Sequence, residues 1–377
     1  MQKVFIISAG LLLPILLLLA IYNLVFKEEK VVDQSVINDQ TQGLDENSLG
    51  NSVIRKKIMQ VTDVSIISPT FDETKEKIKY YDKSGIVWQI DADGGNKKQL
   101  SSQKLNQLKE VLWSPDKKKV ITHFSENGER FYYYDFKADK VSELKKGLDF
   151  VRWDTLGTRI IYKYFDEESK KRSLNISNID GSDWKELAPI SYRYISVSPI
   201  PQSSIISFWN MPKATDESIL QLVGSNGGEI RTLLKGKYGA DYLWSTDGQQ
   251  ALVSSLMEKG INKINLGLVS MDGQYKSLDI PTLVSKAVWS SDKKTLYYAL
   301  PGDIPEGSIM PDDYDNRKIA TSDTFWSVDV TIGTKQRLVE LKDIPEKYDA
   351  SNLFLSPTED ALYFINRSDN KLYRIEF

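Results

Sequence analysis

The sequence contains no cysteine and, among 377 residues, a single histidine, His123. The absence of cysteine excludes disulfides, thiolate metal sites and cysteine nucleophiles. One histidine excludes sites built from several imidazoles and leaves one imidazole base. Charge of neither sign predominates, with 49 Lys and Arg against 52 Asp and Glu, so nucleic acid is not expected as a partner. These absences favour a protein that binds over one that catalyses.

One long uncharged run is present, at residues 4–26. A helix of this length reaches about 35 Å, enough to cross a hydrocarbon core of about 30 Å. A cleaved signal peptide is the alternative, but its apolar region is shorter and ends at a small-residue cleavage site, which is absent here. We therefore predict a transmembrane signal anchor over residues 1–26. The short tail before it favours a single-pass membrane protein whose body lies outside the cytoplasm, in the periplasm or at the cell surface.

Residues 27–52 follow the anchor and contain no aromatic side chain. Asp, Asn, Gln, Ser and Glu dominate this stretch, which cannot bury enough apolar area to order itself. It is typical of a flexible polar tether. A helix packed on the body is the alternative.

The remaining chain repeats one motif, whose fullest copy is Val-Leu-Trp-Ser-Pro-Asp at residues 111–116. The Ser or Asp that follows the Trp position falls at residues 68, 114, 154, 198, 245, 290 and 356, so five of the six steps measure 40 to 47 residues and the last measures 66. The shorter steps match a four-stranded propeller blade. Asp-Gly and Asn-Gly turns between apolar runs add hairpin signals to several repeats. Seven repeats predict an all-β, seven-bladed β-propeller after the transmembrane helix.

The two ends of residues 53–377 complement each other. The last repeat ends after its third strand, and the strand-like run 53–61 precedes the first repeat without a blade of its own. We expect residues 53–61 to supply the outer strand of blade seven, which removes an open sheet edge.

The repeated Trp-Ser-Pro-Asp motif resembles the blade of TolB-type propellers and the N-terminal propeller of dipeptidyl peptidase IV-like proteins, over about residues 53–377. Trp113 to Asp116 match in full, and the units at Trp244 and Trp289 match except at the Pro position. The resemblance implies a fold with varied uses, among them protein binding, lectin-like binding and accessory roles in hydrolases.

Most conspicuous residues have a structural interpretation. The recurring Trp113, Trp153, Trp244 and Trp289 indicate packing between blades, and the Ser-Pro-Asp segments indicate type I turns. His123 lies within a strand-like run and is interpreted as structural. Residues 91–95 (Asp-Ala-Asp-Gly-Gly) suggest a hairpin; a calcium loop is the weaker alternative, because further acidic ligands are missing. The sequence thus predicts no cofactor, with a structural or channel cation such as calcium as the alternative.

Residues 301–323 form the longest loop and account for the 66-residue step. Insertions on one face of a repeat protein often mark the binding face. This loop is a candidate to cap the central channel or contact a partner, and Trp209 and Met211 in a neighbouring loop are candidate exposed anchors. The candidate binding-face residues are Trp209, Met211, Ile309, Met310, Asp312, Asp313, Tyr314 and Asp315.

The leading functional expectation is a non-catalytic platform, held at the membrane by its N-terminal helix, that binds a protein or a cell-envelope polymer. Two alternatives remain. One is a hydrolase or lyase that acts at the central channel with acidic residues and a cation. The other is a glycan-binding lectin that depends on Trp209.

Overall fold

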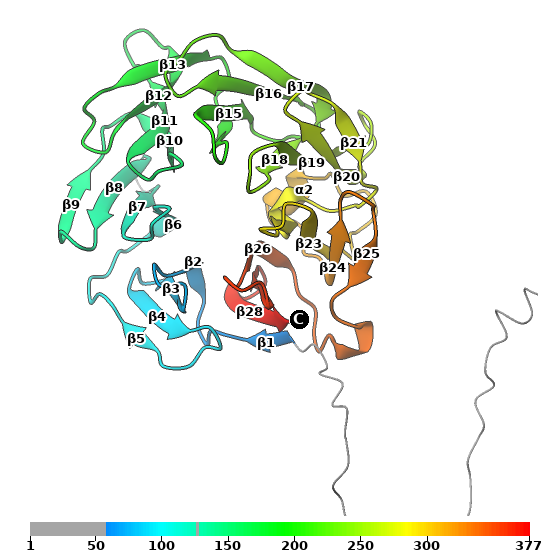
Figure 1. Cartoon of the computed structure of the whole chain (residues 1–377). Helices are drawn as coiled ribbons and strands as arrows, with labels where there is room; N and C mark the ends of the chain where they lie inside the picture. The colour runs from blue at the N-terminus through cyan, green and yellow to red at the C-terminus, as the bar shows by residue number, and fades with distance from the viewer. Residues whose placement is uncertain (1–57, 126–127) are drawn as a thin grey trace, which may run out of the picture. The chain divides into compact units, whose positions relative to one another are not determined.

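Each sequence repeat folds into one four-stranded antiparallel sheet. The computed structural model describes residues 58–125 and 128–377, and its seven sheets surround a central opening (Figure 1). The first strand of each repeat lies at this opening and the fourth lies at the rim. The predicted seven-bladed, all-β propeller is confirmed.

The first four blades follow the chain in order. Blade 1 comprises β2 (Ile66–Phe71), β3 (Lys77–Asp82), β4 (Val87–Asp91) and β5 (Lys98–Gln99). Blade 2 comprises β6 (Leu108–Trp113), β7 (Lys119–Phe124), β8 (Arg130–Asp135) and β9 (Lys140–Glu143). Blade 3 comprises β10 (Leu148–Trp153), β11 (Arg159–Phe165), β12 (Arg172–Asn178) and β13 (Lys185–Ile190). Blade 4 comprises β14 (Ile195–Pro199), β15 (Ile205–Asn210), β16 (Glu217–Gly224) and β17 (Arg231–Tyr238).

The last three blades carry the short helical elements. Blade 5 comprises β18 (Asp241–Trp244), β19 (Gln250–Leu256), β20 (Ile264–Ser270) and β21 (Tyr275–Ser277). The 3₁₀ turn η1 (Val284–Lys286) leads into blade 6, which comprises β22 (Ala287–Trp289), β23 (Thr295–Leu300), β24 (Thr324–Asp329) and β25 (Lys335–Arg337). Helix α2 (Asp312–Asp315) lies between β23 and β24, and η2 (Leu341–Asp343) follows β25. Blade 7 comprises β26 (Ala350–Leu355), β27 (Ala361–Asn366), β28 (Lys371–Glu376) and β1 (Ile58–Gln60).

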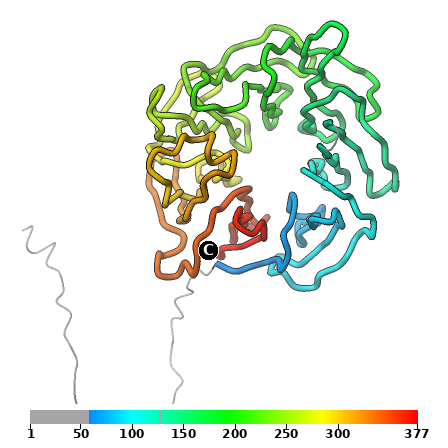
Figure 2. Tube along the Cα trace, turned by 180° about the vertical axis from the view of Figure 1, so that it is seen from behind, coloured from blue at the N-terminus to red at the C-terminus, as the bar shows by residue number. Residues whose placement is uncertain are grey.

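The ring is closed by strands from both ends of the described chain. β1 pairs antiparallel with β28, with Ile58 opposite Ile375 and Gln60 opposite Tyr373. Figure 2 shows from behind that the blue segment of β1 runs beside the red C-terminal strand. The described part of the run 53–61 thus occupies the outer position in blade 7 that the sequence predicted for it.

The recurring tryptophans join neighbouring blades. The Trp113 indole N–H donates to the Ser68 carbonyl at 2.8 Å, and the Trp153 indole N–H donates to the Leu112 carbonyl at 2.8 Å. In both cases the acceptor belongs to the preceding blade. The predicted role of these side chains in packing between blades is confirmed.

The turns at the ends of the strands also match their sequence signals. The Lys117 N–H donates to the Ser114 carbonyl at 2.9 Å, which closes the Ser-Pro-Asp turn. The Gly94 N–H donates to the Asp91 carbonyl at 2.9 Å, and Gly94 adopts a φ of 94°, which glycine accepts without strain. The segment 91–95 is therefore a hairpin turn.

The predicted anchor (1–26) and tether (27–52) lie outside the described residues. Within the part of the chain that the structure describes, no helix has the length and apolar character needed to cross a membrane. Both segments stay predictions.

Candidate active site at the channel mouth

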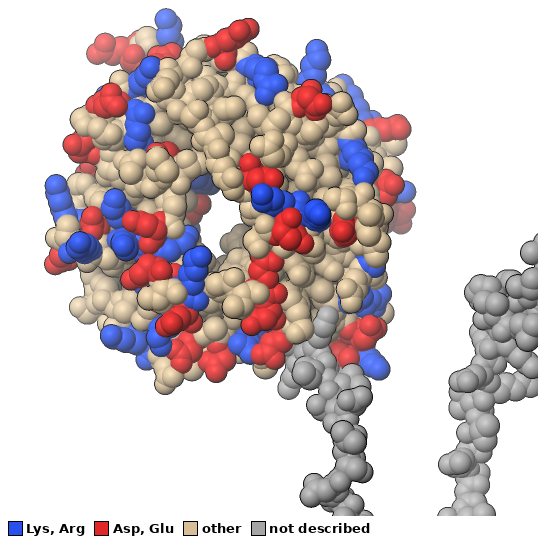
Figure 3. All heavy atoms as spheres, viewed as in Figure 1, with Lys and Arg blue, Asp and Glu red and all other residues tan. Residues whose placement is uncertain are grey.

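The insertion between β23 and β24 folds onto the body of the propeller. Met310 and Tyr314 are buried, and they pack with Leu256, Ile264 and Leu283 of blades 5 and 6. This packing holds helix α2 against the start of β18, at the edge of the central opening (Figure 1). Acidic and basic side chains gather beside the opening in this region, where Figure 3 shows a hole through the ring. The insertion therefore builds part of the channel mouth.

The structure separates the eight candidate binding-face residues into exposed and buried groups. Met211 is 51% exposed and Ile309 is 45% exposed, so both remain candidates. Trp209 is buried, and the exposure predicted for it is wrong, because its ring packs in the core beside Tyr242. Met310 and Tyr314 are also buried and are not available as surface anchors.

The three aspartates of α2 differ in their contacts. Asp312 is half-buried and accepts a hydrogen bond from the Ala214 N–H at 2.6 Å, which ties the helix to blade 4. Asp313 pairs with Lys318 at 2.8 Å. Asp315 is exposed at the end of the helix. Its carboxylate forms no hydrogen bond and no ion pair with any residue that the structure describes.

Asp315 and Asp241 form an electrostatically coupled carboxyl pair. Asp241 opens the inner strand of blade 5, where burial raises the pKa of its carboxyl to about 6. Asp315 keeps an exposed surface, but the protein around its carboxyl removes water from it, which raises its pKa to about 6 together with the negative charge of Asp241. Two carboxyls that gain and lose protons near neutrality supply both an acid and a base.

Hydrogen-bond donors and a cation lie beside the two carboxyls. The Trp209 indole N–H donates to Asp241 Oδ1 at 3.0 Å and fixes the orientation of that carboxyl. The guanidinium of Arg367 lies near Asp315, where its charge lowers the pKa of that carboxyl against the effect of burial. Arg367 also stacks on the Tyr314 ring, with Cζ 3.8 Å from the ring centroid.

A fully buried ion cluster lies against Tyr314 of α2. Lys286 Nζ lies 2.6 Å from Asp323 Oδ2 and 2.9 Å from Asp349 Oδ1. Burial alone would lower the pKa of Lys286, but the two carboxylates raise it above its usual value, so the ammonium stays charged. The Tyr314 hydroxyl donates to Asp349 Oδ1 at 2.9 Å and connects the helix to the cluster. The cluster therefore positions α2, and Asp315 with it, relative to blades 6 and 7.

His123 lies in blade 2, in a separate cluster. Its ring stacks on Phe131 with centroids 4.3 Å apart, and Nε2 contacts the Glu129 carboxylate. The side chain is buried, which agrees with the predicted structural role.

No protein-family model matches this chain, and no curated protein matches it significantly. Solved structures do match. An oligogalacturonate lyase in complex with manganese has a TM-score of 0.65 at 12% identity, over 88% of this chain and 96% of that chain. Oligogalacturonate lyase from Vibrio parahaemolyticus has a TM-score of 0.63 at 10% identity, over the same shares. The β-propeller domain of the Trilobed protease from Pyrococcus furiosus has a TM-score of 0.55 at 12% identity, over 82% of this chain and 95% of that chain.

The chain has the fold of the lyase and protease propellers. The resemblance predicted from the Trp-Ser-Pro-Asp repeat is thus confirmed at the level of the fold. The expectation of a non-catalytic platform is contradicted, because the ring that extends over most of this chain is that of two enzymes. The error came from equating catalysis with cysteine and histidine, although carboxyls alone supply acid–base chemistry.

The expectation of no cofactor is also contradicted, because the first of these lyases holds manganese. Carboxylate, carbonyl and water oxygens suit such a metal. Within residues 58–125 and 128–377, however, no group of three or more His, Asp or Glu is placed to hold a metal ion. His123 is engaged in blade 2. The residues that the structure describes therefore do not supply a ready-made cluster of carboxylates for manganese.

The sequence analysis missed Asp241, Lys286, Asp349 and Arg367. Two of them share a position in the repeat. Asp241 and Lys286 each stand three positions before a repeat tryptophan, Trp244 or Trp289, where an inner strand begins. Glu110 is charged at the same position before Trp113, so this position does not by itself mark the candidate site.

Proposed function

We propose that this protein is a lyase that cleaves an acidic polysaccharide at the channel mouth formed by blades 5 to 7. The carboxyl pair of Asp241 and Asp315 carries the proposal. Perturbed pKa values in a concave site mark candidate catalytic groups. The ring shared with two oligogalacturonate lyases supports the reaction class, and galacturonate supports an acidic sugar as the substrate.

The arrangement suits β-elimination. A base removes the proton from the carbon next to the sugar carboxylate, the C–O bond on the adjacent carbon breaks, and a C=C bond forms. Asp315, the exposed member of the pair, is assigned as the base in its ionised form. Asp315, protonated by this step, then returns the proton to the departing sugar oxygen as the C–O bond breaks. The negative charge of Asp241 raises the pKa of Asp315 and so favours its taking up the proton. Arg367 supplies positive charge beside the base, where negative charge develops on the substrate.

The N-terminal predictions fit this role. We further propose that the anchor over residues 1–26 and the tether over residues 27–52 display the propeller outside the cytoplasm. There it would meet polymers of the cell envelope.

The test is an assay for unsaturated product. The full-length chain is incubated with oligogalacturonate, and the ultraviolet absorbance of the new C=C bond conjugated to the carboxylate is followed. We expect product from the native protein and a loss of about 10²- to 10⁴-fold in Asp315→Asn, since this is the usual contribution of a general base. The rate should rise with pH through about pH 6, because the base acts only when ionised.

Asp303→Asn is the matched control. Asp303 lies in the same insertion, is exposed, and pairs with Lys347 rather than with the carboxyl pair. We expect this variant to keep its activity. Folded protein that yields no unsaturated product, or an active Asp315→Asn variant, would refute the proposal. New reducing ends without the absorbance would indicate a hydrolase.

A further inference from the structure

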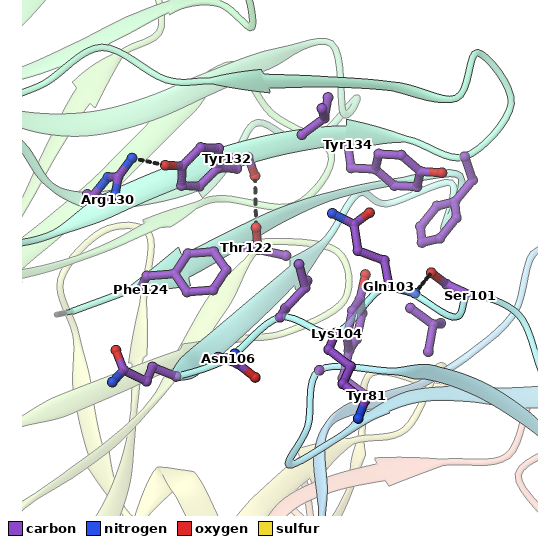
Figure 4. A pocket seen from close by; sticks show the side chains of 16 residues that line it. Tyr81, Ser101, Gln103, Lys104, Asn106, Thr122, Phe124, Arg130, Tyr132 and Tyr134 are labelled. Atoms are coloured by element: carbon purple, nitrogen blue, oxygen red, sulfur yellow. Dashed lines mark hydrogen bonds between the residues drawn. The ribbon is translucent and has the colours of Figure 1, made fainter.

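A pocket lies between blades 1 and 2, across the ring from the channel mouth of blades 5 to 7 (Figure 1). Its volume is about 520 Å³, within the usual range of small-ligand sites. Strands β7 and β8 form one wall, and the connecting segment 101–107 forms another (Figure 4). The carboxyl pair belongs to blade 5 and the insertion of blade 6, so this pocket is a separate site.

The pocket exists because the junction of blades 1 and 2 is filled less completely than other junctions. At two other junctions, the fourth-strand leucines Leu144 and Leu338 donate their N–H groups to the carbonyls of Phe131 and Phe325 at 2.8 Å. The corresponding bond in blade 1 joins Leu100 to Val87, also at 2.8 Å.

The side chains at these matched positions differ in burial and size. Leu144 and Leu338 are 6% and 5% exposed, whereas Leu100 is 37% exposed. Val87 is also smaller than the phenylalanine found at the two other junctions. Because Leu100 is exposed and Val87 is small, the space between blades 1 and 2 is not filled by side chains.

The wall of the pocket on blade 2 is aromatic. Phe124 and Tyr132 lie 5.6 Å apart in a T-shaped arrangement, and Tyr134 and Phe136 lie 4.8 Å apart in another. All four rings are half-buried, so part of each remains accessible. Flat aromatic surfaces of this kind accept the C–H faces of sugar rings while their edges stay polar.

The opposite wall carries hydrogen-bonding and positively charged groups. Figure 4 shows Gln103 directed from the connecting segment toward the strand that carries Tyr132 and Tyr134. Gln103 and Asn106 offer amides that both donate and accept hydrogen bonds. Lys104 on this segment and Arg130 on β8 are the charged residues of the lining, which contains no Asp or Glu. Arg130 pairs with Glu143 at 3.1 Å, so Lys104 carries the unpaired positive charge. Lys104 is exposed and forms no ion pair with any residue that the structure describes.

We propose that this pocket is a second saccharide site, which holds part of an acidic oligosaccharide away from the channel mouth. Stacking on Tyr132 and Tyr134, amide contacts to hydroxyls, and Lys104 beside a sugar carboxylate account for its lining. The identity of the saccharide rests on the proposed function, since the same polymer would reach both sites. The pocket then raises affinity for long chains without taking part in bond cleavage.

The test measures binding of trigalacturonate to the full-length Asp315→Asn chain by titration calorimetry, so that no cleavage interferes. We expect Lys104→Glu to weaken one binding event at least tenfold. Val87→Phe, which places in the pocket the ring found at two other junctions, should abolish that event. Lys235→Glu, an exposed lysine on β17 of blade 4, is the matched control and should bind as the parent does.

The outcomes separate this proposal from the proposed function. Unchanged binding in both pocket variants, or equal binding of neutral maltotriose, would overturn the second site. Loss of binding in Lys104→Glu, in a native chain that cleaves nothing, would support the saccharide site while refuting the lyase. If Val87→Phe fails to fold, Lys104→Glu decides alone, because Lys104 is exposed.

Discussion

Replacing Asp241 with asparagine should stabilise the fold at neutral pH while it removes activity. Asp241 has a folded pKa of about 6 against an ordinary value of 3.8, because burial penalises its charged form. An uncharged amide of the same shape avoids this penalty. Asparagine also keeps an oxygen to accept the Trp209 indole N–H. The stability of the protein is therefore lowered by a group that the proposed reaction requires.

The sign and the size of this change in stability follow from the folded and the ordinary pKa of Asp241. Between about pH 4 and pH 6 the folded protein binds more protons at Asp241 than the unfolded chain does, so the free energy of unfolding falls as pH rises. At about 1.4 kcal/mol for each pKa unit, the full difference corresponds to about 3 kcal/mol above pH 6. Asp241 is half-buried, so solvent screening reduces the effect and we expect roughly 1–2 kcal/mol. Below about pH 4 the native protein and the variant should be equally stable.

Urea denaturation at about pH 4 and about pH 7.5 measures this difference. Asp82→Asn is a control for which the expected change in stability has the opposite sign. Burial alone would raise the pKa of Asp82, but hydrogen bonds from Ser84 and Trp88 lower it below its usual value. Asp82 thus contributes stability above its unfolded pKa, and its replacement should destabilise the protein at the higher pH. An Asp241→Asn variant that is no more stable than the native protein at pH 7.5 would refute the reasoning.

Two further predictions concern the ion cluster and the ring closure. Lys286→Ala should lower the free energy of unfolding by about 3–5 kcal/mol, because it leaves Asp323 buried without its cation and Asp349 with Arg367 alone, 3.9 Å away. A loss below about 1 kcal/mol in urea denaturation would contradict the cluster. Ile58→Ala should lower the free energy of unfolding by about 2–5 kcal/mol, because Ile58 pairs with β28 and is buried in the core that includes blade 7. Gln60 lies on the same strand but is exposed, so Gln60→Ala should change stability by less than about 0.5 kcal/mol. Equal melting temperatures for the two variants would show that β1 does not close the ring.

The fold was predictable because each blade carries its own local signals. The Trp and Ser of the repeat mark the inner strand and its turn, as Trp153 and Ser114 show in the structure. Ring closure was equally open to prediction, because a missing strand at one end of a repeat array must be matched by an extra strand at the other. Both the repeat motif and the matching strands at the two ends can be read directly from the sequence.

The candidate site was only partly predictable, because it depends on distances between blades. The sequence pointed to the insertion and to Asp315, but it gave no sign that Asp241 would lie close enough to raise the pKa of that carboxyl. Trp209 was predicted to be exposed because it follows a strand, whereas packing against Tyr242 buries it. Burial and pairing of this kind arise only when separate repeats come together.

A propeller built from repeats offers a second kind of signal, which is departure from its own pattern. The insertion at residues 301–323 is such a departure, and it carries Asp315 to the channel mouth. Charge three positions before the repeat tryptophan is not a departure, because Glu110, Asp241 and Lys286 share it. The pocket of blades 1 and 2 is less visible, because Leu100 and Leu144 are the same residue type and only their exposure differs. What changes there is the connecting segment 101–107, which turns the chain outward and keeps Lys104 in solvent. Both sites therefore arise where segments outside the repeat alter the surroundings of residues within it.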